Sequence, residues 1–182
     1  MYLMGEKVRL RKVNLSDART ITRWKNDRFI KHMALNPHHK TTIAGERREI
    51  RNALKSKSQL YLIIALRKTD NPIGYIRINW LDKTKSNAWL RFALGKSRGK
   101  GFAADALYTL LRYLFSKNLH RVDAEVYKFN TRCIKLLHHL GFKTEGVRRK
   151  AHFDGTKYHD IVVLGLLKKD FDSKINTRYL RR

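Results

Sequence analysis

Residues 97–107, SRGKGFAADAL, combine two glycines and two basic residues with the start of a helix-forming run. The first N–H groups of a helix have no partner within the helix, and its dipole favours negative charge, so this pattern is typical of phosphate binding. Glycine at 99 and 101 would let the backbone approach a ligand closely. The chemistry that the segment indicates is therefore the binding of a phosphate compound.

Two nucleotide-binding patterns fit this loop poorly. A P-loop needs a glycine where Leu90 stands, and two further glycines intervene between its Lys-Ser pair and the helix. The dinucleotide fingerprint matches Gly99, Gly101 and Ala104, with Glu125 as a possible ribose-binding acid. However, residues 102–182 are too few for a full doubly wound sheet and a substrate domain, and strand 87–94 is more polar than a first Rossmann strand. Both patterns are disfavoured.

Other motifs give the loop a different meaning. Arg98, Gly101 and Ala103 fit the pattern [QR]-x-x-G-x-[GA], and residues 130–142, NTRCIKLLHHLGF, follow downstream. With these motifs the chain resembles the GNAT superfamily of N-acetyltransferases. The opening VRLRKVNLSDA, the segment TRWKND and the segment EGVRRKAHFDGTKYHD resemble its ribosomal-protein alanine or serine N-acetyltransferase branch. The resemblance spans about residues 8–171.

The resemblance implies acetyl-CoA as co-substrate, held between two strands that splay apart. The residues implied to bind it are Phe92, Ala93 and Leu94 along the pantetheine arm, Arg98, Gly99, Lys100, Gly101, Phe102 and Ala103 around the pyrophosphate, and Asn130 beside the arm. Asn130 is otherwise a plain helix cap. The side chains of Arg98 and Lys100 either reach the adenosine phosphates or extend into solvent.

The implied reaction is direct attack of a neutral amine on the thioester, which needs a base for the amine and an acid for the leaving thiolate. Trp89 and Leu137 stand where many family members carry an acid and a tyrosine. Cys133 is a candidate acid, or a small residue packed near a helix start. His152 is a candidate base, or an exposed strand histidine.

Three aromatic residues are candidates for the acceptor cleft, namely Trp24, Phe29 and Trp80; the alternative for each is a place in the core. No metal site is expected. Adjacent histidines, as at 38–39 and 138–139, point in different directions on a helix or strand, and no acidic or thiol partners cluster beside them in the sequence.

The charge is unusual, because 41 Lys and Arg against 15 Asp and Glu give +26. Such a surface attracts polyanions, which indicates an acidic protein or the ribosome as partner, unless the source organism makes basic proteins generally. One cysteine excludes an internal disulfide. Without an export signal or a long apolar run, a cytoplasmic protein that does not enter membranes is expected. Dimers are common in the branch that the chain resembles, so a homodimer is possible.

The elements that must position these residues follow from hydrophobic periodicity. Strands are predicted at 7–13, 60–68, 73–81, 87–94, 122–127 and 142–147, with a closing hairpin at 150–167, and helices at 14–26, 42–55, 102–117 and 130–140. The prediction is one α/β (α+β) domain over 1–182, with a mixed central sheet, splayed strands, about four flanking helices, a core at 8–171 and a basic tail at 172–182. The acceptor stays open between a protein N-terminus and a small amine such as an amino sugar, an antibiotic or an amino acid. A weakly catalytic CoA-binding or RNA-associated module is a third reading.

Overall fold

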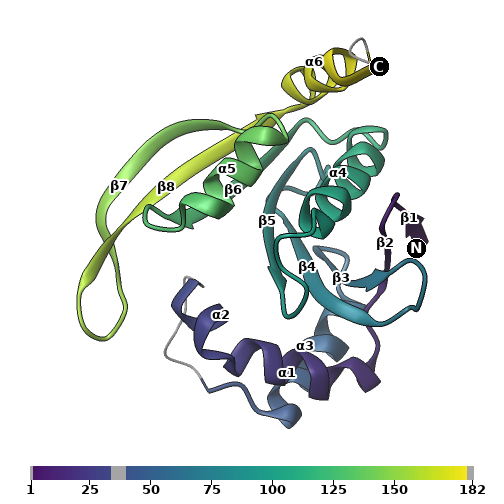
Figure 1. Cartoon of the computed structure of the whole chain (residues 1–182), viewed down its shortest axis with the longest axis vertical. Helices are drawn as coiled ribbons and strands as arrows, with labels where there is room; N and C mark the ends of the chain where they lie inside the picture. Colours follow the sequence, from purple (N-terminus) through teal and green to yellow (C-terminus); the bar gives the residue numbers. More distant parts are fainter. Residues whose placement is uncertain (1, 34–39, 180–182) are drawn as a thin grey trace.

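A single sheet organises the chain in the computed structural model, which describes residues 2–33 and 40–179. The sheet has eight strands in the order β1-β2-β3-β4-β5-β6-β8-β7 (Figure 1). Their bounds are β1 Tyr2–Met4, β2 Val8–Lys12, β3 Gln59–Leu66, β4 Pro72–Trp80, β5 Asn87–Leu94, β6 Arg121–Tyr127, β7 Lys143–Phe153 and β8 Tyr158–Leu167. Among the described strands only β5 and β6 pair in parallel, so the sheet is mixed, as predicted.

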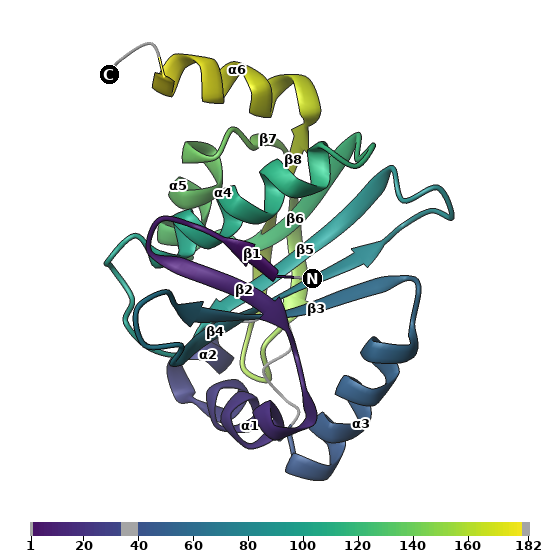
Figure 2. The same ribbon diagram turned by 90° about the vertical axis from the view of Figure 1, so that its right-hand side faces the viewer.

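Helices cover both faces of this sheet. A 3-10 turn at Leu15–Asp17 precedes α1 (Ala18–Asn26), α2 (Arg28–Met33) and α3 (Ile43–Lys55); later come α4 (Phe102–Phe115), α5 (Thr131–His139) and α6 (Lys168–Tyr179). Figure 2 shows α1 and α3 on the opposite side of the sheet from α4. None of the helices in the described ranges has the length and apolar character needed to cross a membrane.

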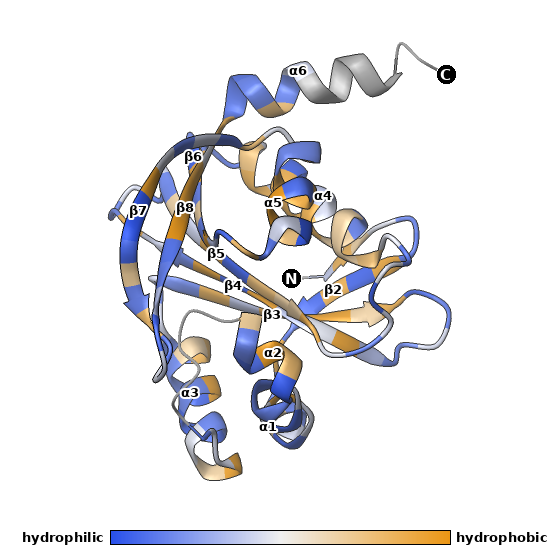
Figure 3. Ribbon diagram, turned by 60° about the vertical axis from the view of Figure 1, so that its left-hand side comes forward, coloured by the Kyte–Doolittle hydropathy of each residue, from blue (hydrophilic) through white to orange (hydrophobic). Residues whose placement is uncertain are grey.

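The apolar run of β3 explains the two layers. Leu62 and Ile64 belong to the core cluster that includes α4, whereas Tyr61 and Ile63 belong to the cluster under α1 and α3. Successive side chains of a strand point to opposite faces, so a strand covered on both faces reads as a continuous apolar run. By contrast, β7 lies at the edge of the sheet and is largely hydrophilic (Figure 3).

The predicted splay is present between β5 and β6. These strands pair only at Asn87 with Arg121, Ala88 with Val122 and Trp89 with Asp123. Beyond this junction β5 stays paired with β4 as far as Leu94, while β6 follows β8 as far as Tyr127. The sheet therefore consists of two halves that share three residue pairs and then diverge.

Most predicted elements are present, and the differences have local causes. Thr42 caps α3, its hydroxyl accepting from the N–H of Gly45 at 3.0 Å. The strand predicted at 142–147 and the first arm of the hairpin form one strand, β7, because a bulge near Lys150 (φ 46°) absorbs the irregularity without ending the pairing with β8. Three elements, β1, α2 and α6, were not predicted from the sequence. Residues 172–179 of the predicted tail continue α6, and residues 180–182 lie outside the described chain.

Candidate functional site

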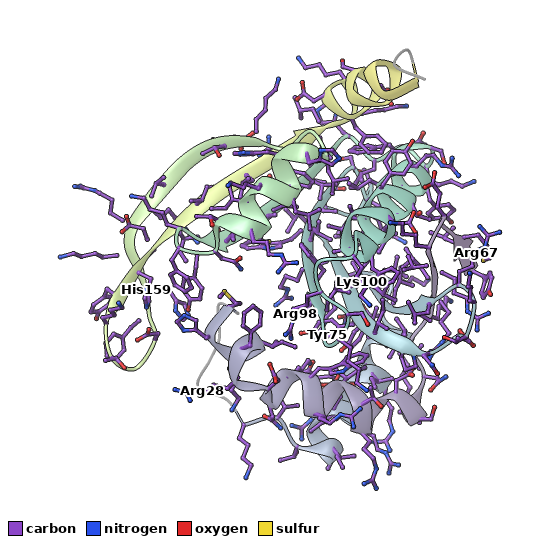
Figure 4. The ribbon with its side chains drawn as sticks, in the orientation of Figure 1. Arg28, Arg67, Tyr75, Arg98, Lys100 and His159 are labelled. Carbon is purple, nitrogen blue, oxygen red and sulfur yellow. The ribbon has the colours of Figure 1, made fainter. Side chains whose placement is uncertain are left out.

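A cleft of about 970 Å³ opens where β5 and β6 diverge. Its walls come from α1, α2, α3, β4, β5, the loop before α4 with the start of that helix, α5, β6, β7 and β8. Figure 4 shows Tyr75 and Arg98 near the middle of the molecule and His159 at the left, on the β7–β8 hairpin. Of the residues predicted to act at a site, Phe29, Phe92, Ala93, Leu94, Arg98, Gly99, Gly101, Phe102, Ala103, Asn130, Cys133 and His152 line this one cleft.

The glycine loop lies at one end of the cleft with its backbone N–H groups available. Gly99 (φ 90°) and Gly101 (φ 79°) have left-handed backbones, and α4 begins immediately after Gly101. Within the described chain, no hydrogen bond is donated by the backbone N–H groups of residues 98–104. This is the arrangement of an anion site at a helix N-terminus.

Two cations that were not predicted from the sequence flank this loop. A Cβ on Gly99 would lie 3.1 Å from Nη2 of Arg132, and one on Gly101 would lie 3.3 Å from Nζ of Lys7. The Lys7 ammonium also donates to the carbonyl of Lys100 at 3.2 Å. Positive charge beside the free N–H groups strengthens the site for an anion.

Asp105 fixes the start of α4 against the beginning of the chain. Its carboxylate accepts from the backbone N–H groups of Glu6 at 3.0 Å, Lys7 at 2.8 Å and Val8 at 2.9 Å. The glycine loop is thereby attached at both ends, to β5 before it and to the turn between β1 and β2 after it. A braced loop keeps its N–H groups oriented without help from a ligand.

Arg98 contributes in a way that neither predicted alternative describes. Its Nε donates to the carbonyl of Leu94 at 3.0 Å, and its guanidinium lies 4.3 Å from the ring centroid of Phe29. Its Nη2 is 3.7 Å from Oδ1 of Asp27. The side chain therefore joins the glycine loop to α2. Lys100 is exposed and does not line the cleft, which agrees with a side chain in solvent.

Asn130 and Cys133 lie together at the start of α5. The Asn130 Oδ1 accepts from the N–H of Cys133 at 3.2 Å, so the side chain caps the helix while the residue lines the cleft. Burial raises the pKa of the Cys133 thiol to about 12. An ordinary thiol has a pKa of about 8.5, so its thiolate is a weaker base than the Cys133 thiolate. Proton transfer from Cys133 to such a thiolate is therefore unfavourable. The thiol is thus a poorer acid than its residue type suggested.

His152 faces the cleft from β7 and is held by a tyrosine. Its Nδ1 lies 2.7 Å from Oη of Tyr127, a buried residue at the end of β6. Burial and then the charge of Asp154 raise the pKa of Tyr127 to about 12, so the phenol stays protonated. The Tyr127 ring stacks on Phe129 with centroids 4.8 Å apart. His152 is therefore a positioned imidazole.

The cleft also has a polar floor, formed by β4 and β5, that was not predicted from the sequence. Tyr75, Arg77 and Asn79 of β4 alternate along their strand, as do Trp89 and Arg91 of β5, and all five line the cleft. Alternation places them on one face of the sheet. The alternating pattern was visible in the sequence, but the strand register that brings the two sets together was not.

Two predicted cleft residues lie elsewhere. Trp24 is 3% exposed in the core cluster under α1 and α3, and a Cβ on Gly95 would lie 2.1 Å from its Nε1. Trp80 packs against the other core cluster, with Nζ of Lys85 5.9 Å from its ring centroid. Neither lines the cleft, because each points into a packed layer of the domain. Phe29, the third candidate, does line it.

Histidines do not assemble a metal site in the described part of the chain. No group of three His, Cys, Asp or Glu side chains there is arranged to hold an ion. The Nε2 of His138 lies 3.0 Å from Oγ1 of Thr144. His38 and His39 lie outside the described residues.

The chain is similar to a known protein family. Residues 7–143 match the model of the acetyltransferase (GNAT) domain. An uncharacterized N-acetyltransferase, p20, of Bacillus licheniformis is 32% identical over 173 residues, covering 93% of this chain and 97% of that protein.

Solved structures agree on the fold. The spermidine N-acetyltransferase of Vibrio cholerae, in complex with CoA and spermine, has a TM-score of 0.82 at 21% identity and covers 90% of this chain and 97% of its own. RimL, a ribosomal L7/L12 alpha-N-protein acetyltransferase in complex with CoA, has a TM-score of 0.82 at 15% identity and covers 92% and 98%. At such identities the likeness concerns the fold alone.

Proposed function

Since this chain belongs to the GNAT family of acetyltransferases and is an acetyl-CoA-dependent N-acetyltransferase, we propose that its acceptor is the primary amine of a protein N-terminus. The observation that carries the assignment of the site is the glycine loop. Its N–H groups at 98–104 have no partner in the described chain and open on the cleft where β5 leaves β6.

The cofactor's place follows from the same features. Its pyrophosphate would accept from the N–H groups of the loop, with Arg132 and Lys7 adding positive charge. Its pantetheine arm would run along the backbone of Phe92 and Ala93, on the edge of β5 that β6 leaves open. In this proposal the thioester would lie in the cleft beyond the glycine loop, near the polar floor.

His152 is the proposed base for the amine. When Nδ1 is protonated and donates a hydrogen bond to Oη of Tyr127, Nε2 has a free lone pair. This lone pair can accept a proton from the incoming ammonium. The neutral amine then attacks the thioester carbonyl and the C–S bond breaks. The proton that remains on the attacking nitrogen passes to the departing CoA thiolate, which leaves an amide and a free thiol. Cys133 has a packing role in this scheme, because burial keeps its thiol a weak acid.

A protein acceptor is favoured by charge. The net charge of +26 attracts acidic partners, including ribosomal assemblies. RimL, one of the structural neighbours, acts on a ribosomal protein N-terminus. The second candidate is a small amine, the type of acceptor of the spermidine N-acetyltransferase neighbour, and the third is a weakly catalytic CoA-binding module.

The decisive experiment has two stages. Isothermal titration with acetyl-CoA tests the cofactor site, and absence of binding at millimolar cofactor would contradict it. A thiol-release assay then compares N-terminal peptides with amino sugars, amino acids and polyamines. Faster release with peptides supports the protein N-terminus, whereas a preference for a small amine replaces it. Binding without release for any amine would favour the weakly catalytic module.

A further inference from the structure

Two arginines face each other on the floor of the cleft. In the register of β4 and β5, Arg77 is directly opposite Arg91. Like charges in directly opposed positions destabilise a sheet unless each is compensated. One of the two arginines is paired with a carboxylate and the other is not, and this difference indicates what the cleft can bind.

The positive charge of Arg77 is compensated by a carboxylate. Its Nη1 lies 2.7 Å from Oε2 of Glu49, and its Nη2 donates to Oε1 of Gln59 at 3.0 Å. Lys25 lies 3.2 Å from the same Glu49 oxygen and 2.7 Å from Oε2 of the fully buried Glu46. Burial alone would raise the pKa of Glu49, but the charges of Lys25 and Arg77 outweigh it and lower that pKa. Two acids thus balance two bases.

Arg91 has no such partner. Its Nη2 donates to Oδ1 of Asn79 at 2.8 Å, and among the described residues it forms no ion pair. Partial desolvation and then the positive charge of Arg77 lower the pKa of its guanidinium. The side chain is exposed and lines the cleft, so an arriving group can reach the N–H groups that Asn79 leaves free.

The acids of the cleft offer little to a cationic acceptor. Within the described lining they are Glu49, held by Lys25 and Arg77, and Glu125, which is paired with Arg148. A polyamine would have to displace these partners before it found a carboxylate. Arg91 is therefore the charged side chain of the floor that has no ion-pair partner among the described residues. The group that would complement it is an anion.

Taking the proposed acetyltransferase function as given, we infer that the acceptor is a primary amine that carries a carboxylate, and that Arg91 binds this carboxylate through its guanidinium. Asn79 holds the guanidinium in place, and its planar donors suit the two oxygens of a carboxylate. The carboxylate can come from an acidic residue next to a peptide N-terminus or from a free amino acid. The experiment separates these sources.

The test measures kcat/KM, expressed per neutral amine, for acceptors in which a carboxylate is replaced by an amide. One pair is the peptide amides Ser-Asp-Ala-Ala and Ser-Asn-Ala-Ala, and the other is alanine and alaninamide. We expect the carboxylate form of at least one pair to be preferred by about tenfold or more, as for a charge-assisted hydrogen bond. The pair that shows the preference identifies the source.

Variants assign the preference to Arg91. Arg91→Gln should remove it without weakening acetyl-CoA binding, and Arg91→Lys should retain part of it. Arg47→Gln is the matched control, because Arg47 is exposed on α3 and lies outside the cleft. This substitution removes the same charge as Arg91→Gln. The preference of Arg47→Gln should equal that of the native protein.

Each failure has its own meaning. If amines release CoA but carboxylate and amide forms react equally, or if Arg91→Gln keeps the preference, the inference is overturned while the acetyltransferase stands. A preference for spermidine over all four acceptors would overturn it as well. If acetyl-CoA binds and no amine of any kind releases CoA, the proposed function falls, and this inference with it.

Discussion

The phenolic Oη of Tyr127 lies 2.7 Å from Nδ1 of His152, at the point where β6 and β7 face the cleft. The two residues come from strands that do not pair with each other, since β8 lies between them in the sheet. A hydrogen bond at one imidazole nitrogen sets the role of the other. Tyr127 is therefore a positioning residue for the proposed base.

Replacing this tyrosine tests the arrangement. In Tyr127→Phe the ring keeps its stacking on Phe129 but loses the hydrogen bond. We expect kcat to fall by about tenfold while KM for acetyl-CoA changes little, because a base contributes to the rate and not to cofactor binding. Tyr158→Phe, on the exposed hairpin, should keep the native kcat. An unchanged kcat in Tyr127→Phe would remove the tyrosine from the scheme.

The glycine loop makes a second prediction. Gly101→Ala forces a side chain onto a left-handed backbone and towards Lys7, which should cost about 1–2 kcal/mol and displace the free N–H groups. We expect acetyl-CoA to bind at least about tenfold more weakly by calorimetry. Gly146→Ala is the control, since its Cβ would meet nothing within 4 Å. Equal affinity in both variants would contradict a backbone phosphate site here.

The buried carboxylate of Glu46 predicts a difference in stability. It is 0% exposed and accepts from Nζ of Lys25 at 2.7 Å and Oη of Tyr61 at 2.9 Å. Glu46→Gln should lower the free energy of unfolding by about 1–3 kcal/mol, because two donors lose a charged partner. Glu49→Gln, at a side chain 48% exposed, should cost less than about 1 kcal/mol in urea titrations. The reverse order would show that the burial of Glu46 is not what matters.

Cys133 predicts a dependence on alkaline pH. Folding raises the pKa of its thiol from 9.0 to about 12, so the folded protein holds the proton more tightly than the unfolded chain. This contribution to stability is complete below pH 9 and is lost as the pH rises towards 12. Native protein should react slowly with Ellman's reagent at pH 8, and unfolded protein rapidly. Because Cys133 is the only cysteine, the signal has one source. Equal rates would contradict the burial effect.

Strong local patterns made much of the fold predictable. The strand at 87–94 and the helix that begins at Phe102 carry clear periodicity, and Thr42 and Asn130 are good cap residues. The six-residue α2 is too short to show a period. α6 has no apolar stripe along its length, so the pattern did not separate it from the tail.

The candidate site was predictable only where it depends on a local sequence motif. The cofactor end is a contiguous motif, so Gly99 and Gly101 could be recognised from their order in the sequence. The floor depends on the register that sets Arg77 against Arg91, and on helices that bring Lys25 and Glu49 above it. Contacts between segments that are distant in the sequence cannot be predicted from the local spacing of residues. For the same reason Trp24 could not be told apart from a cleft residue.

The divergence of β5 from β6 has one more consequence, for solubility. An unpaired strand edge is ordinarily a template on which another chain can add and start aggregation. Here the open edge of β5 lies inside a cleft walled by α2, α5 and β7, so a slender extended molecule can reach it more easily than a strand with side chains on both faces. Ligand that fills the cleft would shield this edge as well, so acetyl-CoA should slow heat-induced aggregation, measured by light scattering, in addition to raising Tm.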